Sequence, residues 1–212
     1  MRKPNALTSS LAASFLLAAA FGATLAVRPA GAEAVIWRAD PAHTEVNFSV
    51  KHFFTPVTGT FDDFEIDLNY DPENTENSSV EVRIRVESVN TGNEKRDNHL
   101  RSGDWFGAEA HPYMTFTSTS VEKVGDNEFV ARGALTIKGH SSEIELPITL
   151  LGTQQIPEQM QEMLGGTKEV ASFKASAAIN RGDFEVGVGS WAATMVVGSE
   201  INIEILVEAH RK

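Results

Sequence analysis

The feature of this chain that most constrains its fold is an alternation of apolar and polar residues that recurs from Thr44 almost to the C-terminus. Successive side chains of a β-strand point to opposite faces, so an alternating run predicts a strand with one buried face. Eight runs occur, and the residues on their apolar faces are Val46, Phe48, Val50, His52 and Phe54; Phe64, Ile66 and Leu68; Val80, Val82, Ile84 and Val86; Met114 and Phe116; Phe129, Ala131, Gly133, Leu135 and Ile137; Ile144, Leu146, Ile148 and Leu150; Phe173, Ala175, Ala177 and Ile179; and Ile201, Ile203, Ile205 and Val207. The sequence therefore predicts an all-β protein.

The connections between the runs indicate how the strands are arranged. Turn residues such as Asp71-Pro72 and Lys138-Gly139 separate them, and no regularly interposed helices are present to make parallel crossovers. A two-sheet sandwich and a closed barrel can both bury one apolar face per strand. Eight consecutive strands favour an eight-stranded antiparallel barrel, because closure also removes exposed sheet edges.

Two connections predict short helices. The first, residues 91–106, opens with Thr91-Gly92-Asn93-Glu94, the spacing of a capping box in which Thr91 is the N-cap. Gly103 is the expected end of this helix. The second, residues 157–166, has room for one or two helical turns that present Met160, Met163 and Leu164.

The densest group of functional side chains lies in residues 96–106. If this stretch is helical, Asp97 and Arg101 are spaced to form an i, i+4 ion pair. Trp105 and Phe106 then follow the helix and can turn onto the mouth of the barrel. We interpret the stretch as a structural plug, which would also control entry to the interior.

The N-terminus has the pattern of a secretory signal peptide. Arg2 and Lys3 precede an apolar stretch at about residues 11–27, and Ala30-Gly31-Ala32 supplies the small residues of a cleavage site. We expect residues 1–32 to be a signal peptide and 33–212 to be the mature barrel domain; a retained signal anchor is the alternative. Cleavage removes three of 18 basic residues and none of 29 acidic ones, taking the net charge from -11 to -14.

Composition excludes several classes of function. The chain has no Cys, which rules out thiol catalysis, thiolate metal sites and disulfides. The excess of acidic residues argues against nucleic-acid binding and against a polybasic membrane patch.

The histidines give little support for a metal site or for catalysis. No two of the six histidines lie closer than nine residues, so spacing alone predicts no metal site and no catalytic residue. A cluster in space of His43, His52, His99 or His111 with a carboxylate remains open. A hydrolase, lipid-acting or metal-assisted, would use His43, His99 and Asp97.

A series of short motifs carries a resemblance to a known family. In chain order they are Asp40-Pro41-Ala42-His43-Thr44, Val46-Asn47-Phe48-Ser49-Val50-Lys51-His52, Gly59-Thr60-Phe61, Ser88-Val89-Asn90-Thr91-Gly92, Arg96-Asp97-Asn98-His99-Leu100, Asp104-Trp105-Phe106, His111-Pro112-Tyr113-Met114-Thr115-Phe116, Gly133-Ala134-Leu135-Thr136-Ile137-Lys138-Gly139 and Asn180-Arg181-Gly182-Asp183-Phe184. In this order they resemble the YceI-like family of exported lipid- and polyisoprenoid-binding proteins.

The resemblance implies a lipocalin-like barrel in the bacterial periplasm that sequesters or carries an isoprenoid or similar lipid. It also implies a homodimer, a link to stress responses and a membrane b-type cytochrome as partner. Such a carrier needs neither catalytic residues nor a cofactor. The expected ligand-binding residues are Phe48, Val50, Phe64, Ile66, Val82, Ile84, Trp105, Phe106, Met114, Phe116, Leu135, Ile137, Leu146, Ile148, Phe173, Trp191, Ile203 and Ile205. Besides the hydrolase, a structural partner of a membrane redox protein with a solid barrel remains open.

Overall fold

The computed structural model describes residues 36–71, 74–193 and 195–212. Its strands are β1 (Ile36–Ala39), β2 (Glu45–His52), β3 (Thr55–Phe61), β4 (Phe64–Asn69), β5 (Ser79–Arg85), β6 (Val89–Asn90), β7 (Tyr113–Lys123), β8 (Glu128–Ile137), β9 (His140–Gln155), β10 (Glu169–Asn180) and β11 (Val197–Arg211). Its helices are α1 (Glu94–Arg101) and α2 (Glu158–Gln161), with 3-10 turns η1 (Thr75–Asn77), η2 (Val86–Ser88), η3 (Arg181–Phe184) and η4 (Gly189–Trp191). The predicted signal peptide, residues 1–32, lies outside the described residues.

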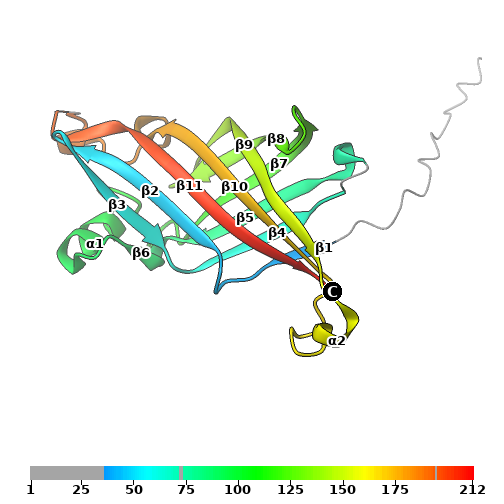
Figure 1. Cartoon of the computed structure of the whole chain (residues 1–212). Coiled ribbons are helices and arrows are strands. Elements are labelled where there is room, and N and C mark those ends of the chain that lie inside the picture. The colour runs from blue at the N-terminus through cyan, green and yellow to red at the C-terminus, as the bar shows by residue number, and fades with distance from the viewer. Residues whose placement is uncertain (1–35, 72–73, 194) are drawn as a thin grey trace, which may run out of the picture. The chain divides into compact units, whose positions relative to one another are not determined.

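The strands form a closed antiparallel barrel, as the sequence predicts. The ring runs β1-β4-β5-β7-β8-β9-β10-β11 and returns to β1, which makes eight strands (Figure 1). Within this ring the β1–β11 pairing is the shortest, with Arg38 opposite His210 and Ala39 opposite Ala209. We call this pairing the barrel seam.

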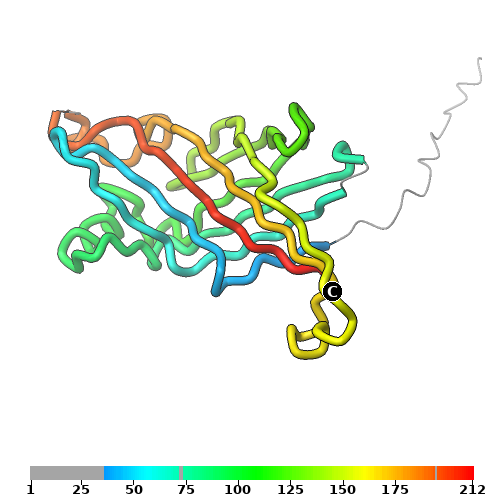
Figure 2. Tube along the Cα trace, viewed as in Figure 1, coloured from blue at the N-terminus to red at the C-terminus, as the bar shows by residue number. Residues whose placement is uncertain are grey.

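The long strand β11 has two partners along one edge. Residues near its C-terminal end pair with β1, and earlier residues pair with β2. The strands β1 and β2 therefore lie one after the other along the same edge of β11. In the same way β3 pairs with β2 while β4 pairs with β1. The trace shows the blue N-terminal strand and the red C-terminal strand converging at one end (Figure 2).

The predicted alternation is visible in the burial of the strands. Along β8 the inward side chains are buried and the outward ones are half-exposed, with Phe129, Ala131, Leu135 and Ile137 all facing the interior. The interior forms one continuous core of apolar side chains from most of the strands. A pattern of period two therefore gave the correct inward face.

The sequence pattern misses three strands, β1, β3 and β6, and places one residue on the wrong face. The alternating run that begins at residue 44 ends in a hairpin at Phe53, whose φ is 53°, and Phe54 is 95% exposed instead of facing the core. After the hairpin the chain returns as β3, which the pattern missed because Pro56 and Gly59 interrupt its apolar face. Strands β1 and β6 were missed because their four and two residues are too few to show an alternating pattern.

The helical connections also differ in detail from the prediction. The N-cap of α1 is Asn93, whose side chain accepts from Arg96 N at 3.0 Å, and not Thr91. The predicted Asp97–Arg101 pair is not formed. Asp97 instead accepts from Thr91 N at 2.9 Å and from its hydroxyl, while Arg101 donates to the carbonyl oxygens of β6 and η2.

The two helices lie at opposite ends of the barrel. Helix α1 is beside β6, and α2 is near the C-terminus (Figure 1). In the second predicted helical stretch Met160, Met163 and Leu164 are exposed. Within the described residues, every helix falls short of the length and apolar character needed to cross a bilayer.

Candidate functional site

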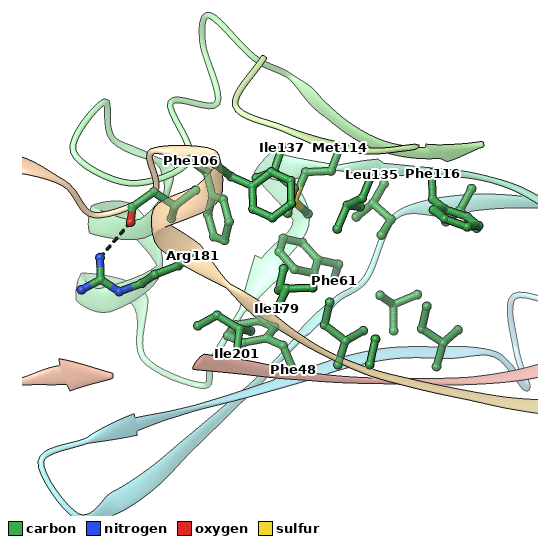
Figure 3. Close-up of a pocket in the computed structure, with 18 of the residues that line it drawn as sticks. Phe48, Phe61, Phe106, Met114, Phe116, Leu135, Ile137, Ile179, Arg181 and Ile201 are labelled. Carbon is green, nitrogen blue, oxygen red and sulfur yellow. Dashed lines mark hydrogen bonds between the residues drawn. The ribbon is translucent and has the colours of Figure 1, made fainter. Parts of the chain in front are cut away.

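The barrel interior holds an apolar cavity of about 140 Å³ at the α1 end, which we call the main cavity. Of the 26 residues that line it, Asn47, Thr115 and Arg181 alone are not apolar (Figure 3). Of the predicted ligand-binding residues, 13 line this cavity: Phe48, Val50, Val82, Ile84, Trp105, Phe106, Met114, Phe116, Leu135, Ile137, Leu146, Ile203 and Ile205.

A second apolar cavity of about 60 Å³ lies further along the barrel, and we call it the distal cavity. Its lining includes the predicted residues Ile66, Ile148 and Phe173. Val82, Leu146 and Ile205 line both cavities and therefore stand between them. Of the predicted set, Phe64 and Trp191 line neither cavity and instead pack against the core.

Sequence reasoning missed part of the lining. The alternation does give a signal for Val46, Ile144, Ala177, Ile179 and Ile201, because these residues share the inward parity of the predicted ones. No comparable signal marks the remaining members, which are Phe61 of the missed strand β3, Leu100 of α1, Arg181 and Phe184 of η3, Val186 of the following loop, Val197 at the start of β11, and the polar residues Asn47 and Thr115.

Two segments close the α1 end of the barrel, residues 91–112 and 181–193, and we call them the plug. Trp105 is buried, its indole Nε1 donates to His99 Nε2 at 3.3 Å, and its ring lies 5.8 Å from that of Trp191. Lys138 Nζ donates to Gly103 O at 3.0 Å and Glu185 O at 2.9 Å, which ties the two segments together. The predicted structural plug is therefore present.

Arg181 is the charged group at the wall of the main cavity, with 4% of its surface exposed. Its Nε donates to Gly198 O at 2.9 Å, its Nη1 to Val186 O at 2.8 Å and to Gly187 O, and its Nη2 to Trp191 O at 2.8 Å and Val197 O at 3.2 Å. Guanidinium has five N–H donors, so all are used by backbone carbonyls.

The charge of Arg181 has a structural role in the plug. Burial lowers the pKa of its guanidinium, because desolvation disfavours the charged form. Its Cζ also lies 5.5 Å from the centre of the Trp105 ring, within reach of a cation–π contact. Since no donor is left over, Arg181 holds the plug in place and offers no hydrogen bond to a ligand.

The structure does not assemble the residues of the hydrolase hypothesis into one site. Asp97 is bound to Thr91, and His99 contacts Trp105 and Trp191. His43 belongs to a separate group with Asp40 and Glu208, which is the one set of three histidine or acidic residues at metal-ligand spacing in the described part of the chain.

Comparisons with known proteins agree with this architecture. Residues 37–209 match the model of the YceI-like domain. The chain belongs to the YceI-like family. Protein YceI of Escherichia coli O157:H7 is 35% identical over 163 residues, which cover 76% of this chain and 81% of that protein.

Two solved structures share the fold. BcnA of Burkholderia cenocepacia superposes with a TM-score of 0.71 at 27% identity, covering 80% of this chain and 98% of that one. A polyisoprenoid binding domain from Saccharophagus degradans gives a TM-score of 0.62 at 14% identity, covering 85% of this chain and 100% of that one. At that identity the second likeness concerns the fold alone.

Proposed function

We propose that this protein binds a polyisoprenoid or similar long apolar chain inside its barrel and sequesters or carries it without chemical change. The observation that carries the proposal is the main cavity, whose lining is apolar apart from three residues and whose one charged group has every donor satisfied. Such a lining binds by removing apolar surface from water, at about 0.8 kcal/mol per CH₂ group. Membership of the YceI-like family supports the same ligand class, because the family resemblance implies an isoprenoid or similar lipid.

The size of the cavities indicates how a long chain would bind. An apolar cavity of about 150 Å³ holds a molecule the size of benzene, so the main cavity of about 140 Å³ fits only one end of an isoprenoid. A longer chain needs the distal cavity as well. We expect the side chains of Val82, Leu146 and Ile205 to rotate and join the two cavities when the ligand enters.

Mass spectrometry of an organic extract of the purified protein tests the proposal. We expect an apolar chain at a stoichiometric ratio in the wild type. Val82→Phe places a larger side chain between the cavities, so its extract should contain shorter chains or at least tenfold less lipid.

The matched control is Glu81→Gln, which alters the neighbouring outward-facing residue of β5 and should leave the extract unchanged. Circular dichroism should show that both variants are folded, since overpacking a core costs about 1–3 kcal/mol. A lipid-free wild-type protein, prepared without detergent, contradicts the proposal whatever the variants do.

We also propose that the protein is exported to the periplasm by cleavage of residues 1–32. The N-terminal signal pattern and the family support this proposal. The mass of the protein in a periplasmic extract should correspond to a chain that starts at Glu33. A chain that retains residues 1–32 would contradict cleavage. The homodimer, the stress response and the cytochrome partner implied by the family stay predictions.

A further inference from the structure

A second group of chemically active side chains lies outside the cavity, at the barrel seam. Asp40 and His43 are in the turn between β1 and β2, and Glu208 is near the end of β11. One ligand atom of each lies within 4.8 Å of the others. His43 Nδ1 is 2.7 Å from Asp40 Oδ2 and 3.7 Å from Glu208 Oε1.

His210 extends this group. Its Nε2 is 3.0 Å from Glu208 Oε1 and 4.0 Å from Asp40 Oδ2. Around a tetrahedral zinc ion with bonds of about 2.0–2.1 Å, neighbouring ligand atoms are about 3.4 Å apart. The four separations in this group, from 2.7 to 4.0 Å, scatter on both sides of that value. Asp40, His43 and Glu208 form the set whose ligand atoms all lie within 4.8 Å of one another, and the side chain of His210 would rotate toward them to complete a tetrahedron.

The backbone holds the four residues in place. Asp40 N donates to Glu208 O at 2.8 Å, which fixes the turn against β11. Ala42 N donates to Asp40 Oδ1 at 3.0 Å, so this oxygen is occupied and Oδ2 faces His43. Glu208 and His210 are two residues apart on one strand, so they point to the same face.

The charges of the group also fit a cation. In the described part of the chain, neither Asp40 nor Glu208 forms an ion pair with a Lys or Arg; their cationic partners are imidazoles. Three of the four side chains are partly shielded, with exposures of 23% for Asp40, 32% for Glu208 and 27% for His210, while His43 is 64% exposed.

We propose that Asp40, His43 and Glu208, with His210 as the fourth ligand, bind one divalent transition-metal ion, of which zinc is the best match. Imidazole suits zinc and its neighbours, whereas magnesium and calcium prefer sites made of oxygen alone. The ion would join the first strand of the ring to the last, at the shortest pairing of the ring. None of the four residues lines either cavity, so this proposal is independent of lipid binding.

Isothermal titration of the untagged, EDTA-treated protein with zinc sulfate tests the site. We expect one ion per chain and a dissociation constant in the micromolar range or below. Because a ligand that binds only the folded state stabilises it, zinc at about 100 times its dissociation constant should raise Tm by roughly 5–10 °C. Asp40→Asn and Glu208→Gln should each weaken binding at least tenfold and remove the rise in Tm.

The control is the double variant His140→Gln with Glu185→Gln, which alters a histidine–carboxylate pair 3.5 Å apart that has no third His, Asp or Glu at metal-ligand spacing among the described residues. Its zinc affinity should equal that of the wild type. If the seam variants do not fold, zinc should still shift the imidazole NMR signals of His43 and His210 in the wild type and leave those of His99 and His140 in place. No saturable binding, or equal loss of binding in the control, overturns the proposal.

Discussion

The plug and the seam both close the barrel, but they do so with opposite chemistry. In the plug a buried cation, Arg181, is surrounded by neutral carbonyl oxygens. At the seam, partly exposed acids and imidazoles face one another. The difference follows from water: a buried charge must have all its hydrogen bonds made by the protein, whereas exposed charges can exchange partners with solvent at little cost. The plug is therefore geometrically strict, and the seam is adjustable.

Substitution of Arg181 should have the largest effect on stability and tests whether the plug is stricter than exposed charged groups. Arg181→Ala leaves five backbone carbonyls without their donor and opens a void beside Trp105, so we expect the free energy of unfolding to fall by about 3 kcal/mol or more. Urea denaturation measures this loss. The control Arg132→Ala removes an exposed arginine that bridges Glu122 and Glu145, and should cost less than about 1 kcal/mol. Equal losses would show that the plug is not strict.

Substitution of Gly187 should cause a smaller loss of stability, and it tests the close packing within the plug. Its φ is 64°, and a Cβ there would lie 2.7 Å from Arg181 Nη1 and 2.8 Å from Trp105 Cζ3. Gly189 has nearly the same φ, 67°, but nothing within 4 Å of its Cβ position. Both Ala substitutions carry backbone strain of about 1 kcal/mol, and Gly187→Ala should add about 1–3 kcal/mol from the clash. If thermal unfolding shows the two variants to be alike, the close packing around Gly187 is unimportant.

The smallest effect is expected at the seam, where the stability of the metal-free protein should depend on pH. The hydrogen bond to Asp40, helped by the charge of Glu208, raises the pKa of His43 above its usual 6.5, and the same bond lowers the pKa of Asp40 below 3.8. The stabilisation by His43 is thus complete below pH 6.5 and lost as the pH rises through its raised pKa. That by Asp40 is present above pH 3.8 and lost as the pH falls through its lowered pKa.

An NMR titration of the imidazole protons measures the pKa of His43. We expect a midpoint above 6.5 in the EDTA-treated wild type and a lower midpoint in Asp40→Asn. A midpoint that does not change on substitution would mean that the Asp40–His43 contact is absent in solution.

The sequence predicts those strands in which apolar and polar side chains alternate with a period of two residues. Residues such as Ile84, Phe116 and Ile203 alternate with polar neighbours, and all of them face the main cavity. The period fails where the chain turns sharply, as at Phe54, and where a strand is short or contains proline, as in β1 and β3. Capping is also ambiguous, because Thr91 and Asn93 can both serve and the structure uses the second.

The site residues that were missed owe their roles to contacts that no periodic pattern records. Nothing next to Arg181 in the sequence indicates that its guanidinium is buried, since the carbonyls that accept from it belong to Val186, Gly187, Trp191, Val197 and Gly198. Likewise the histidine spacing conceals the seam, because its ligand set combines a turn at residue 40 with a strand at residue 208. A search limited to pairs of histidines misses the alternation of Glu208 with His210.

The sharing of β11 between β1, β2 and β10 has a consequence for how the chain folds. About 170 residues separate the two strands that meet at the seam, and contacts between such distant segments form late and slowly because loop closure costs entropy first. A chain growing from its N-terminus holds open sheet edges until the fifteen residues of β11 have been made. We therefore expect ring closure to be the final folding event, and truncation of β11 to leave an incomplete and aggregation-prone sheet.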